Sequence, residues 1–498
     1  MAVQVNGAHI SHINGFIPMW LDGREISTSN AFDVISPVTH EVLYQAAAAS
    51  EDDVDAAIRS CEQAFRSWSK TKPHFRRDIF LRAAQIFAAR KDECCQTLRQ
   101  ETGTGKPFFE VTFHQAIEMC KDVAGLIQTI AGQAPIVAEE GKSAIVYREP
   151  LGVVLGIAPW NAPFVLGLRA CIQPLACGNT VILKGPELSP RTFWLIASVL
   201  HEAGLPAGCL NTIYHRPGAD AAMITNALIS SPVVKKVSFT GSTAVGALIA
   251  GLAGKHLKPV LLELGGKAPA IVCENADIVK AAEACALGAF LHSGQICMST
   301  ERILVHKQIS TAFIEALKRV MEETFGNGKN PPILISQAAV AKNKALVCDA
   351  VAKGAQTLYD RDIKSASTTT TGGANGDESN NEMYPVIVGG VRPEMDIYHN
   401  ESFGPTVSLI EFDNDPEAIE IANDTEYGLT SAVFTKDLQR GLRIARQISA
   451  GAVHINGMTV HDETNLPHGG VKKSGFGRNN TLEGLNEWVQ TKTVTWMD

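Results

Sequence analysis

Two apolar stretches, GVVLGIAPW (152–160) and TVILK (180–184), decide the fold class. Each is a short run of aliphatic and β-branched residues, and a segment with helical spacing lies between them. A continuous apolar run of this length is typical of a strand that is buried on both faces. Strands that alternate with helices predict βαβ units and a parallel sheet. The chain is therefore predicted to be an α/β protein.

The alternation continues toward the C-terminus. Ser189-Pro190 is predicted to open the next helix, with Ser as the N-cap and Pro at the first helical position, and this helix ends at Ala203-Gly204. Further strands are expected at CLNTIY (209–214) and KKVSFTG (235–241), and PVLLELGGKAPAIV (259–272) is interpreted as two extended pieces broken by two glycines. A second α/β half follows from about 277 to 470, with helices at 277–292 and 310–324 and strands at 301–305 and 431–434.

The N-terminal part shows a different rhythm. Residues 15–50 are predicted to form short extended pieces, and a helix follows over 51–68, with Ser50 and Asp53 as a capping box. A second helix is expected from about Arg76 to Gln100, and a third over 111–130. Residues 366–381 are small, polar and glycine-containing, which predicts a solvated surface loop.

Composition narrows the class of protein. The chain has 498 residues and a formal net charge of 44 − 52 = −8, which argues against a nucleic-acid binder. Its longest apolar runs, such as 151–158 and 259–264, are far shorter than the ~20 residues of a membrane-spanning helix, and no signal-peptide pattern is found. The eleven cysteines form no CxxC pair, which argues against disulfides and a zinc site. We expect a cytoplasmic protein without a metal.

Common cofactor and nucleophile motifs are missing. ETGTGKP (101–107) lacks the first glycine of a P-loop, and neither a GxGxxG fingerprint after a strand nor a GxSxG elbow occurs. FTGSTAVG (239–246) ends a strand and begins a helix, so its free backbone N–H groups suit a phosphate. A plain capped turn is the alternative interpretation of that segment.

Three side chains carry possible chemistry, and each has a simpler alternative. Cys297 in GQICMS (294–299) follows a predicted helix, and a thiolate there can act as a nucleophile because a positive local field lowers the pKa of a thiol, although a lone cysteine is more often a core residue. Glu263 lies in an apolar run, so it is either functional or faces water at a strand edge. Asn161 ends a buried strand, where its amide can donate to an oxyanion or simply form a turn.

The motifs become specific when they are taken together. PWNAPF, ACGNTVILKGPE, FTGSTAVG, LELGGKAP, GQIC, NESFGP and GGVKKSGFGR occur in one order along the chain. This constellation resembles the aldehyde dehydrogenase superfamily, and the resemblance covers residues from about 20 to 496. It implies a Rossmann-like cofactor domain, an α/β catalytic domain and a small β arm for oligomerisation.

The resemblance implies a role for each reacting residue. Cys297 matches the nucleophile that attacks the aldehyde and later carries a thioester, and Asn161 with the Cys297 N–H matches the oxyanion site. Glu263 matches the base that activates water to hydrolyse the thioester, and it is also expected to help deprotonate Cys297. This glutamate speaks against a relative that passes the acyl group to coenzyme A.

The cofactor implied by the resemblance is NAD, with NADP as the alternative. Lys184 and Glu187 match a K-x-x-E pattern at the adenosine ribose, where a carboxylate repels a 2′-phosphate. Gly241 and Ser242, with the turn that follows, match the pyrophosphate site, Glu401 the nicotinamide ribose and Phe403 the nicotinamide. The other expected cofactor-binding residues are Ile157, Ala158, Pro159, Trp160 and Gly246.

The substrate is predicted from HSGQICMSTERI and NGMTVHDETNLPHGGVKKSGFGR, which look similar to the vanillin, salicylaldehyde and benzaldehyde branch. Arg169 matches an arginine near the substrate pocket of that branch, with a structural salt bridge as its alternative. Phe164 is a further expected substrate contact. His468 is either a substrate contact or an ordinary surface histidine. An aliphatic aldehyde or semialdehyde dehydrogenase, a CoA-acylating dehydrogenase, a cysteine hydrolase and a non-catalytic member remain as alternatives.

The resemblance also divides the chain into domains. Residues 1–124 and 149–264 are expected to form the NAD-binding domain, 265–474 the catalytic domain, and 125–148 with 475–498 the oligomerisation arm. VQTKTVTWMD at the C-terminus alternates as an exposed strand does, and an exposed edge favours pairing with a second chain. A homodimer or homotetramer is therefore expected.

Overall fold

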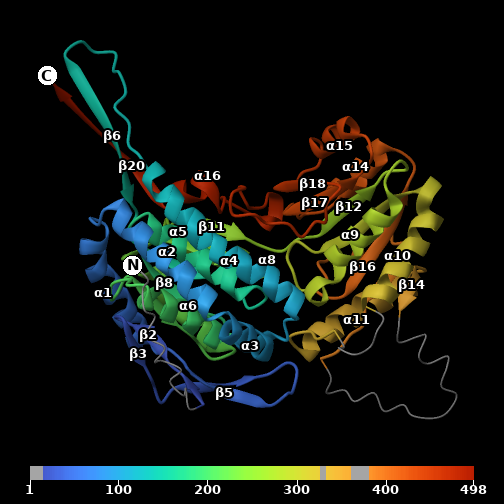
Figure 1. Cartoon of the computed structure of the whole chain (residues 1–498), viewed down its shortest axis with the longest axis horizontal. Helices are drawn as coiled ribbons and strands as arrows, with labels where there is room; N and C mark the ends of the chain where they lie inside the picture. The colour runs from blue at the N-terminus through green and yellow to red at the C-terminus, as the bar shows by residue number, and fades with distance from the viewer. Residues whose placement is uncertain (1–14, 326–331, 361–380) are drawn as a thin grey trace.

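The computed structural model describes residues 15–325, 332–360 and 381–498, and these residues form four sheets, of which the two largest are packed with helices (Figure 1). Of the predicted loop 366–381, only Asn381 lies within the described residues. Its side chain is buried and its Nδ2 donates to the Pro37 carbonyl at 3.2 Å. None of the described helices is both long enough and apolar enough to cross a membrane.

The first large sheet has eight strands in the order β19-β11-β10-β7-β8-β9-β2-β3. Its five central strands run parallel, and antiparallel strands close both edges. The parallel core confirms the α/β prediction. The strands are β2 (Met19–Leu21), β3 (Arg24–Ile26), β7 (Val153–Ile157), β8 (Thr180–Lys184), β9 (Leu210–Ile213), β10 (Val234–Thr240), β11 (Val260–Glu263) and β19 (Gly475–Phe476).

Helices of the N-terminal half pack on this sheet and on one another. The β7, β8 and β9 strands are buried at every position, as expected for strands covered on both faces. The helices are α1 (Glu51–Trp68), α2 (Pro73–Ala89), α3 (Lys91–Thr102), α4 (Lys106–Leu126), α5 (Pro163–Ala176), α6 (Pro190–Glu202), α7 (Ala219–Ser230) and α8 (Thr243–Lys255), with the short η1 (Ile127–Thr129) after α4.

Local sequence signals predicted some helix ends and missed others. The capping box at Ser50 and Asp53 is present and confirms that start of α1. The single helix predicted from Arg76 to Gln100 is wrong, because the chain breaks at Arg90 between α2 and α3. The Arg90 guanidinium there donates to Glu93 and to Ser198 of α6. The break therefore coincides with a contact that local periodicity does not report.

The N-terminus of α6 is capped by a distant residue. Ser189 and Pro190 hold the predicted positions, but the Ser189 side chain makes no capping hydrogen bond. Glu101 from α3 instead accepts from the backbone N–H groups of Arg191 at 2.7 Å and Thr192 at 3.1 Å. A buried carboxylate satisfies these N–H groups and also favours the positive end of the helix dipole.

The second large sheet has seven strands in the order β14-β15-β16-β13-β12-β17-β18, all parallel except the edge strand β14. Neighbouring residues of β12 enter opposite cores, Ile271 one cluster and Ala270 with Val272 the other, because strand side chains alternate between faces. The strands are β12 (Ala268–Val272), β13 (Thr300–His306), β14 (Gln356–Asp360), β15 (Val386–Gly389), β16 (Thr406–Phe412), β17 (Thr430–Phe434) and β18 (Ala452–Ile455).

Helices of the C-terminal half surround the second sheet. The strands and helices expected at 277–292, 310–324, 301–305 and 431–434 are all present. The helices are α9 (Ile278–Phe290), α10 (Ser310–Phe325), α11 (Gln337–Ala352), α13 (Asp396–His399), α14 (Asp415–Asn423), α15 (Leu438–Ala445) and α16 (Thr481–Asn486), with the short η2 (Leu291–Gly294), η3 (Lys307–Ile309) and η4 (Lys472–Ser474).

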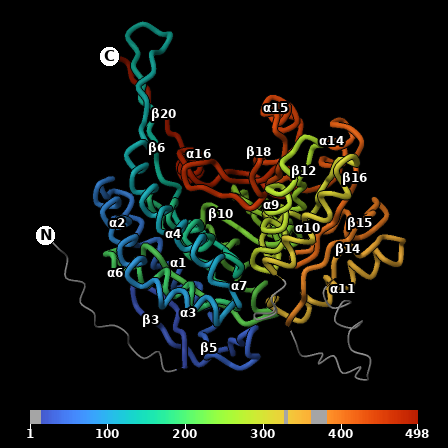
Figure 2. Tube along the Cα trace, turned by 45° about the vertical axis from the view of Figure 1, so that its right-hand side comes forward, coloured from blue at the N-terminus to red at the C-terminus, as the bar shows by residue number. Residues whose placement is uncertain are grey.

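A two-stranded arm projects from the body (Figures 1 and 2). It pairs β6 (Lys142–Pro150) with β20 (Val489–Met497) in an antiparallel ladder. The expected C-terminal strand is confirmed, although one of its edges is already paired with β6. A small third sheet, β1 (Phe16–Ile17), β5 (Val42–Ala47) and β4 (Ala31–Ile35), lies at the opposite end of the molecule. The division into three domains with the stated boundaries stays a prediction.

Candidate active site

The carboxyl ends of four parallel strands bring the first group of predicted residues together. Ile157 of β7 lies beside Lys184 of β8 on one side and Phe239 of β10 on the other. Thr240, the last residue of β10, lies beside Glu263, the last residue of β11. In α/β sheets, ligands bind at this edge of the strands.

Close backbone packing at two glycines joins this edge to the cysteine loop. A Cβ placed on Gly266 would lie 2.3 Å from the carbonyl oxygen of Cys297, so only glycine fits there. A Cβ on Gly294 would lie 2.1 Å from the carbonyl oxygen of Gly404. The LELGG, GQIC and NESFGP segments are therefore in direct contact, which their separation in sequence does not show.

Asn161 is held against the same loop. Its buried Nδ2 donates to the Gln295 carbonyl at 3.0 Å, two residues before Cys297. Gln295 is itself fixed, because its Oε1 accepts from the Ile335 N–H at 2.9 Å and its Nε2 donates to the Ile333 carbonyl at 3.2 Å. The Asn161 amide has a second N–H, so it can still donate to another acceptor.

The surroundings of the Cys297 thiol oppose its ionisation. Burial raises the pKa of the Cys297 thiol, and the nearby carboxylates of Glu263 and Glu401 raise it further, whereas Arg169 acts in the opposite direction. The thiol must lose its proton before it can attack a carbonyl, because the thiolate is the nucleophile.

Glu263 is buried and surrounded by donors, with only 2% of its surface exposed. Its Oε2 accepts from Arg169 at 3.2 Å and from Asn479 Nδ2 at 3.1 Å, and its Oε1 lies 3.2 Å from His468 Nε2. Burial raises the pKa of Glu263, but the positive charges of His468 and Arg169 outweigh it, so the pKa falls below its usual value. The alternative of a water-facing strand-edge glutamate is therefore wrong.

Arg169 and His468 share a second carboxylate, Asp462. Arg169, 3% exposed, donates to Asp462 as well as to Glu263, and His468 Nδ1 lies 3.8 Å from Asp462 Oδ1. His468 is only 7% exposed, so the alternative of an ordinary surface histidine is wrong. Arg169 does form salt bridges with two carboxylates, as the alternative interpretation held. One of these carboxylates is the candidate base Glu263.

Lys184 and Glu187 lie where an adenosine ribose is expected. The Lys184 side chain is buried, and burial lowers its pKa to about 8 while Glu187 opposes the shift. Within the described residues its Nζ has no hydrogen-bond partner or ion pair. The Glu187 carboxylate lies 3.7 Å from His215 Nε2 and is partly exposed. A buried cation without a partner is costly, so it suits a ligand that supplies acceptors.

The FTGSTAVG segment forms the predicted turn from strand to helix. Ser242 is the N-cap of α8, and its side chain accepts from the Val245 N–H. The first N–H groups of an α-helix have no partner within the helix, which suits an anion. Gly241 donates to the Glu263 carbonyl at 3.1 Å, and a Cβ on Gly246 would overlap Leu264. The helix start is therefore held against the glutamate strand.

Glu401 and Phe403 complete this edge from the second half of the chain. Glu401 Oε1 accepts from the Gly266 N–H at 2.9 Å, and its other oxygen has no hydrogen-bond partner among the described residues. Burial raises the pKa of Glu401 to about 7, although the Gly266 hydrogen bond opposes this. Phe403 is in the left-handed region with φ 49°, and its ring meets Trp160 edge-on with centroids 6.0 Å apart. These residues fit a ribose diol beside a flat ring.

The family of the chain is decided by a match over almost its whole length. Residues 24–494 match the model of the Aldehyde dehydrogenase family. The chain belongs to the aldehyde dehydrogenase family. The match confirms the resemblance, and the structural similarities below confirm the fold.

Several aldehyde dehydrogenases are similar to this one over their full lengths. A vanillin dehydrogenase of a Pseudomonas species is 41% identical over 486 residues, which are 96% of this chain and 97% of that protein. The crystal structure of a salicylaldehyde dehydrogenase from Pseudomonas putida complexed with salicylaldehyde has a TM-score of 0.90 at 35% identity, covering 97% of this chain and 98% of that one. A betaine aldehyde dehydrogenase from Staphylococcus aureus in complex with NAD⁺ has a TM-score of 0.88 at 27% identity, covering 96% and 94%.

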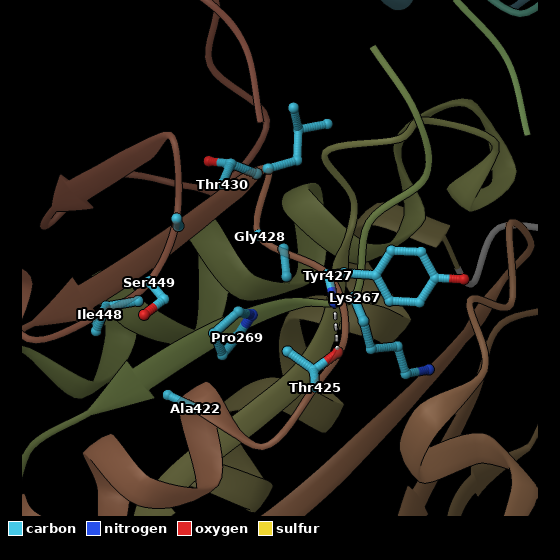
Figure 3. Close-up of a pocket in the computed structure, with 12 residues that line it drawn as sticks. Lys267, Pro269, Ala422, Thr425, Tyr427, Gly428, Thr430, Ile448 and Ser449 are labelled. Carbon is cyan, nitrogen blue, oxygen red and sulfur yellow. Dashed lines mark hydrogen bonds between the residues drawn. The ribbon is translucent and has the colours of Figure 1, made fainter. Parts of the chain in front are cut away.

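Phe164 and a small pocket beside β12 are two further features of the aldehyde dehydrogenase. Phe164 packs edge-on against Phe87 and Phe113 in the helical core, and its predicted substrate contact stays a prediction. A small pocket lies between the start of β12 and the Thr425–Thr430 segment, and Lys267, Tyr427 and Gly428 are among the residues that line it (Figure 3). At its edge, Thr425 Oγ1 accepts a hydrogen bond from the Tyr427 N–H. Neither Cys297 nor Glu263 lines it.

Sequence reasoning missed two residues of the aldehyde dehydrogenase that contact the proposed base or its partners. Asp462 lies in the NGMTVHDETNLPHGG segment, and Asn479 follows GFGR. Backbone hydrogen bonds in both directions join His468 to Asn479, at 3.0 and 2.7 Å. The sequence signal that could have identified Asp462 was its charge within the NGMTVHDETNLPHGG segment, which had already been compared with the family. Its pairing with Arg169, 293 residues earlier, has no local signature.

Proposed function

We propose that this enzyme oxidises an aromatic aldehyde to the carboxylic acid with NAD. The observation that carries the proposal is the contact of the cysteine loop with the glutamate strand at Gly266, next to Asn161. The aromatic substrate class is supported by the names of the vanillin and salicylaldehyde dehydrogenases that this chain resembles. Substrate specificity depends on the shape of the pocket, so it needs its own experiment.

Cys297 is the proposed nucleophile. Once deprotonated, its Sγ forms a bond to the aldehyde carbon, and the carbonyl oxygen gains negative charge. The second N–H of Asn161 and the Cys297 backbone N–H are the proposed donors to that oxygen. Removal of one such donor typically costs ~10²–10³ in rate, because the donors are already oriented before the charge develops. After oxidation the same sulfur holds the acyl group as a thioester.

Glu263 is the proposed base for hydrolysis of the thioester. Its low pKa keeps it ionised at neutral pH, so the carboxylate is available to take a proton from water. Three neighbouring groups also restrain it, since its Oε2 accepts from Arg169 and Asn479 and its Oε1 lies 3.2 Å from His468 Nε2. Glu263 is therefore ionised before the reaction, and it must then hold the proton from water beside the Arg169 cation.

NAD is the proposed cofactor, with NADP as the alternative. The unpartnered Lys184 Nζ and Glu187 would hold the adenosine ribose, the start of α8 the pyrophosphate, and Glu401 with Phe403 the nicotinamide ribose and ring. When bound, the nicotinamide supplies the hydride acceptor of the reaction. A carboxylate at Glu187 favours a 2′-hydroxyl over a 2′-phosphate.

A substrate panel tests the proposed function. We expect NADH formation with benzaldehyde, vanillin and salicylaldehyde at a kcat/KM at least about tenfold above that for straight-chain aldehydes and semialdehydes, with NAD preferred over NADP. The measurement is the absorbance of NADH at 340 nm, with and without coenzyme A. A preference for aliphatic aldehydes would overturn the substrate class, and acyl-CoA in place of free acid would overturn the hydrolytic reaction.

The arm formed by β6 and β20 is the proposed site of self-association in a cytoplasmic homodimer or homotetramer. It exposes apolar side chains at Tyr147, Val494, Trp496 and Met497, and large exposed apolar groups favour an interface. We expect light scattering after size exclusion to give two or four times the chain mass. Deletion of residues 489–498 should reduce it to one chain mass, and a monomeric full-length protein would contradict the proposal.

A further inference from the structure

Five buried polar side chains form a network around the proposed base. Arg169 contributes two ion pairs, one to each carboxylate of the network, and His468 lies between the same two carboxylates. Asn479 donates a further hydrogen bond to Glu263. These groups come from α5, the end of β11, and the chain before and after β19. The members are Arg169, Glu263, Asp462, His468 and Asn479.

The charges in this network do not balance without one more proton. Arg169 carries one positive charge, whereas Glu263 and Asp462 carry two negative charges when they are ionised. With His468 neutral, the buried cluster therefore has one uncompensated negative charge. An uncompensated buried charge is unfavourable, so the cluster favours the uptake of a single proton. His468 is the titratable group that touches Glu263 and lies next to Asp462.

We propose that His468 accepts the proton that Glu263 takes from the hydrolytic water, and that Asp462 positions and stabilises the resulting imidazolium. This inference rests on the proposed function, because it assumes that Glu263 is the base. It adds a proton acceptor behind that base and assigns Asp462 as a positioning residue. The geometry points to this route because Glu263 Oε1 and His468 Nε2 are 3.2 Å apart.

The proposed step balances as follows. A water O–H bond breaks as the water oxygen bonds to the thioester carbon, and the proton moves to Glu263 Oε1. It then moves to His468 Nε2, which leaves Glu263 ionised next to Arg169. The C–S bond breaks with its electron pair on Cys297 Sγ, and the carboxylic acid is released. His468 later returns its proton to solvent, so the cluster is ready for another turnover.

The pH dependence follows from the groups that face His468. These are Glu263 at the end of β11, Asp462 in the segment after β18, Arg169 on α5 and the more distant His454 on β18. Burial lowers the pKa of His468, but Asp462 and Glu263 outweigh it and raise the pKa above 6.5. His468 can accept a proton only when it is neutral. Hydrolysis should therefore increase as the pH rises through this raised pKa.

The test uses His468→Gln in the full-length enzyme. Glutamine keeps an N–H donor near Glu263 but cannot take up a proton. We expect the rapid first turnover of NADH to remain, while the steady-state kcat falls at least about tenfold. The inflection that His468 gives to the plot of log kcat against pH should disappear. His461→Gln is the matched control, because His461 is half-exposed and pairs with the exposed Glu463. It should match the parent enzyme in all three measurements.

Asp462→Asn provides a second variant that keeps the histidine. Removal of this negative charge should shift the kcat inflection to lower pH, because Asp462 is the largest contributor to the raised pKa of His468. A parent-like kcat and pH profile in His468→Gln would overturn the proposal, and so would an unshifted inflection in Asp462→Asn. If Glu263→Gln loses steady turnover while His468→Gln does not, only the proton route is wrong. If Glu263→Gln turns over normally, the base assignment itself is wrong.

Discussion

Replacement of Cys297 by alanine is expected to reduce steady-state NADH formation by on the order of 10⁴-fold or more, while NAD still binds. Without the thiol the proposed nucleophile is missing, so the bond to the aldehyde carbon cannot form. The proposed cofactor residues Lys184 and Glu187 are on β8 and the loop after it, so they should not be disturbed. NAD binding is measured by calorimetry, and turnover by the 340 nm absorbance.

The matched control for this variant is Cys348→Ala. Cys348 is exposed on α11, so its removal should leave both turnover and thermal unfolding unchanged. Several of the nine remaining cysteines are buried in the core, which makes them poorer controls. Substantial oxidation by Cys297→Ala, with the fold intact, would contradict the role of Cys297 as the nucleophile.

Replacement of Glu263 by glutamine should give one rapid turnover of NADH per active site, followed by a steady rate at least about 10²-fold below the parent enzyme. Glutamine has nearly the same shape as glutamate, but it cannot remove a proton from water. Formation and oxidation of the Cys297 adduct precede that step, so the first turnover should survive. Stopped-flow measurement at 340 nm separates the rapid phase from the steady phase.

Glu315→Gln is the control for the loss of a carboxylate. Glu315 is exposed on α10 and pairs with Lys318, so this variant should show a normal steady rate. The melting temperature of Glu263→Gln should also be compared with that of the parent, because the change removes a buried partner of Arg169. An unchanged steady rate would show that another group activates the water.

The local part of the fold could be predicted from the sequence. The alternation of GVVLGIAPW, a helical segment and TVILK predicted the parallel sheet, because strands buried on both faces are apolar throughout. Ser50 and Asp53 predicted the start of α1, because the capping box involves residues only three positions apart. The LELGG motif also placed Glu263 at the end of an apolar extended piece, and the structure has it as the last residue of β11.

The parts that failed depend on distant contacts. The helix break at Arg90 coincides with hydrogen bonding to Ser198, 108 residues further along the chain. Glu101 caps α6 from 90 residues away, which the apparent cap at Ser189 concealed. The network of Arg169, Asp462 and His468 is assembled from α5 and the segment after β18, so its burial and charge balance could not be derived from spacing. These contacts join residues that are far apart in the sequence, so they exist only after the chain has folded.

The proposed mechanism depends most directly on a thioester that forms at Cys297 and is hydrolysed by water that Glu263 activates. The measurement is mass spectrometry of Glu263→Gln, mixed with NAD and benzaldehyde and quenched in acid after one turnover. We predict that the peptide containing Cys297 gains the mass of a benzoyl group in place of one hydrogen, and that hydroxylamine removes it. NADH formation with an unmodified Cys297, or with the benzoyl group on another residue, would contradict the account.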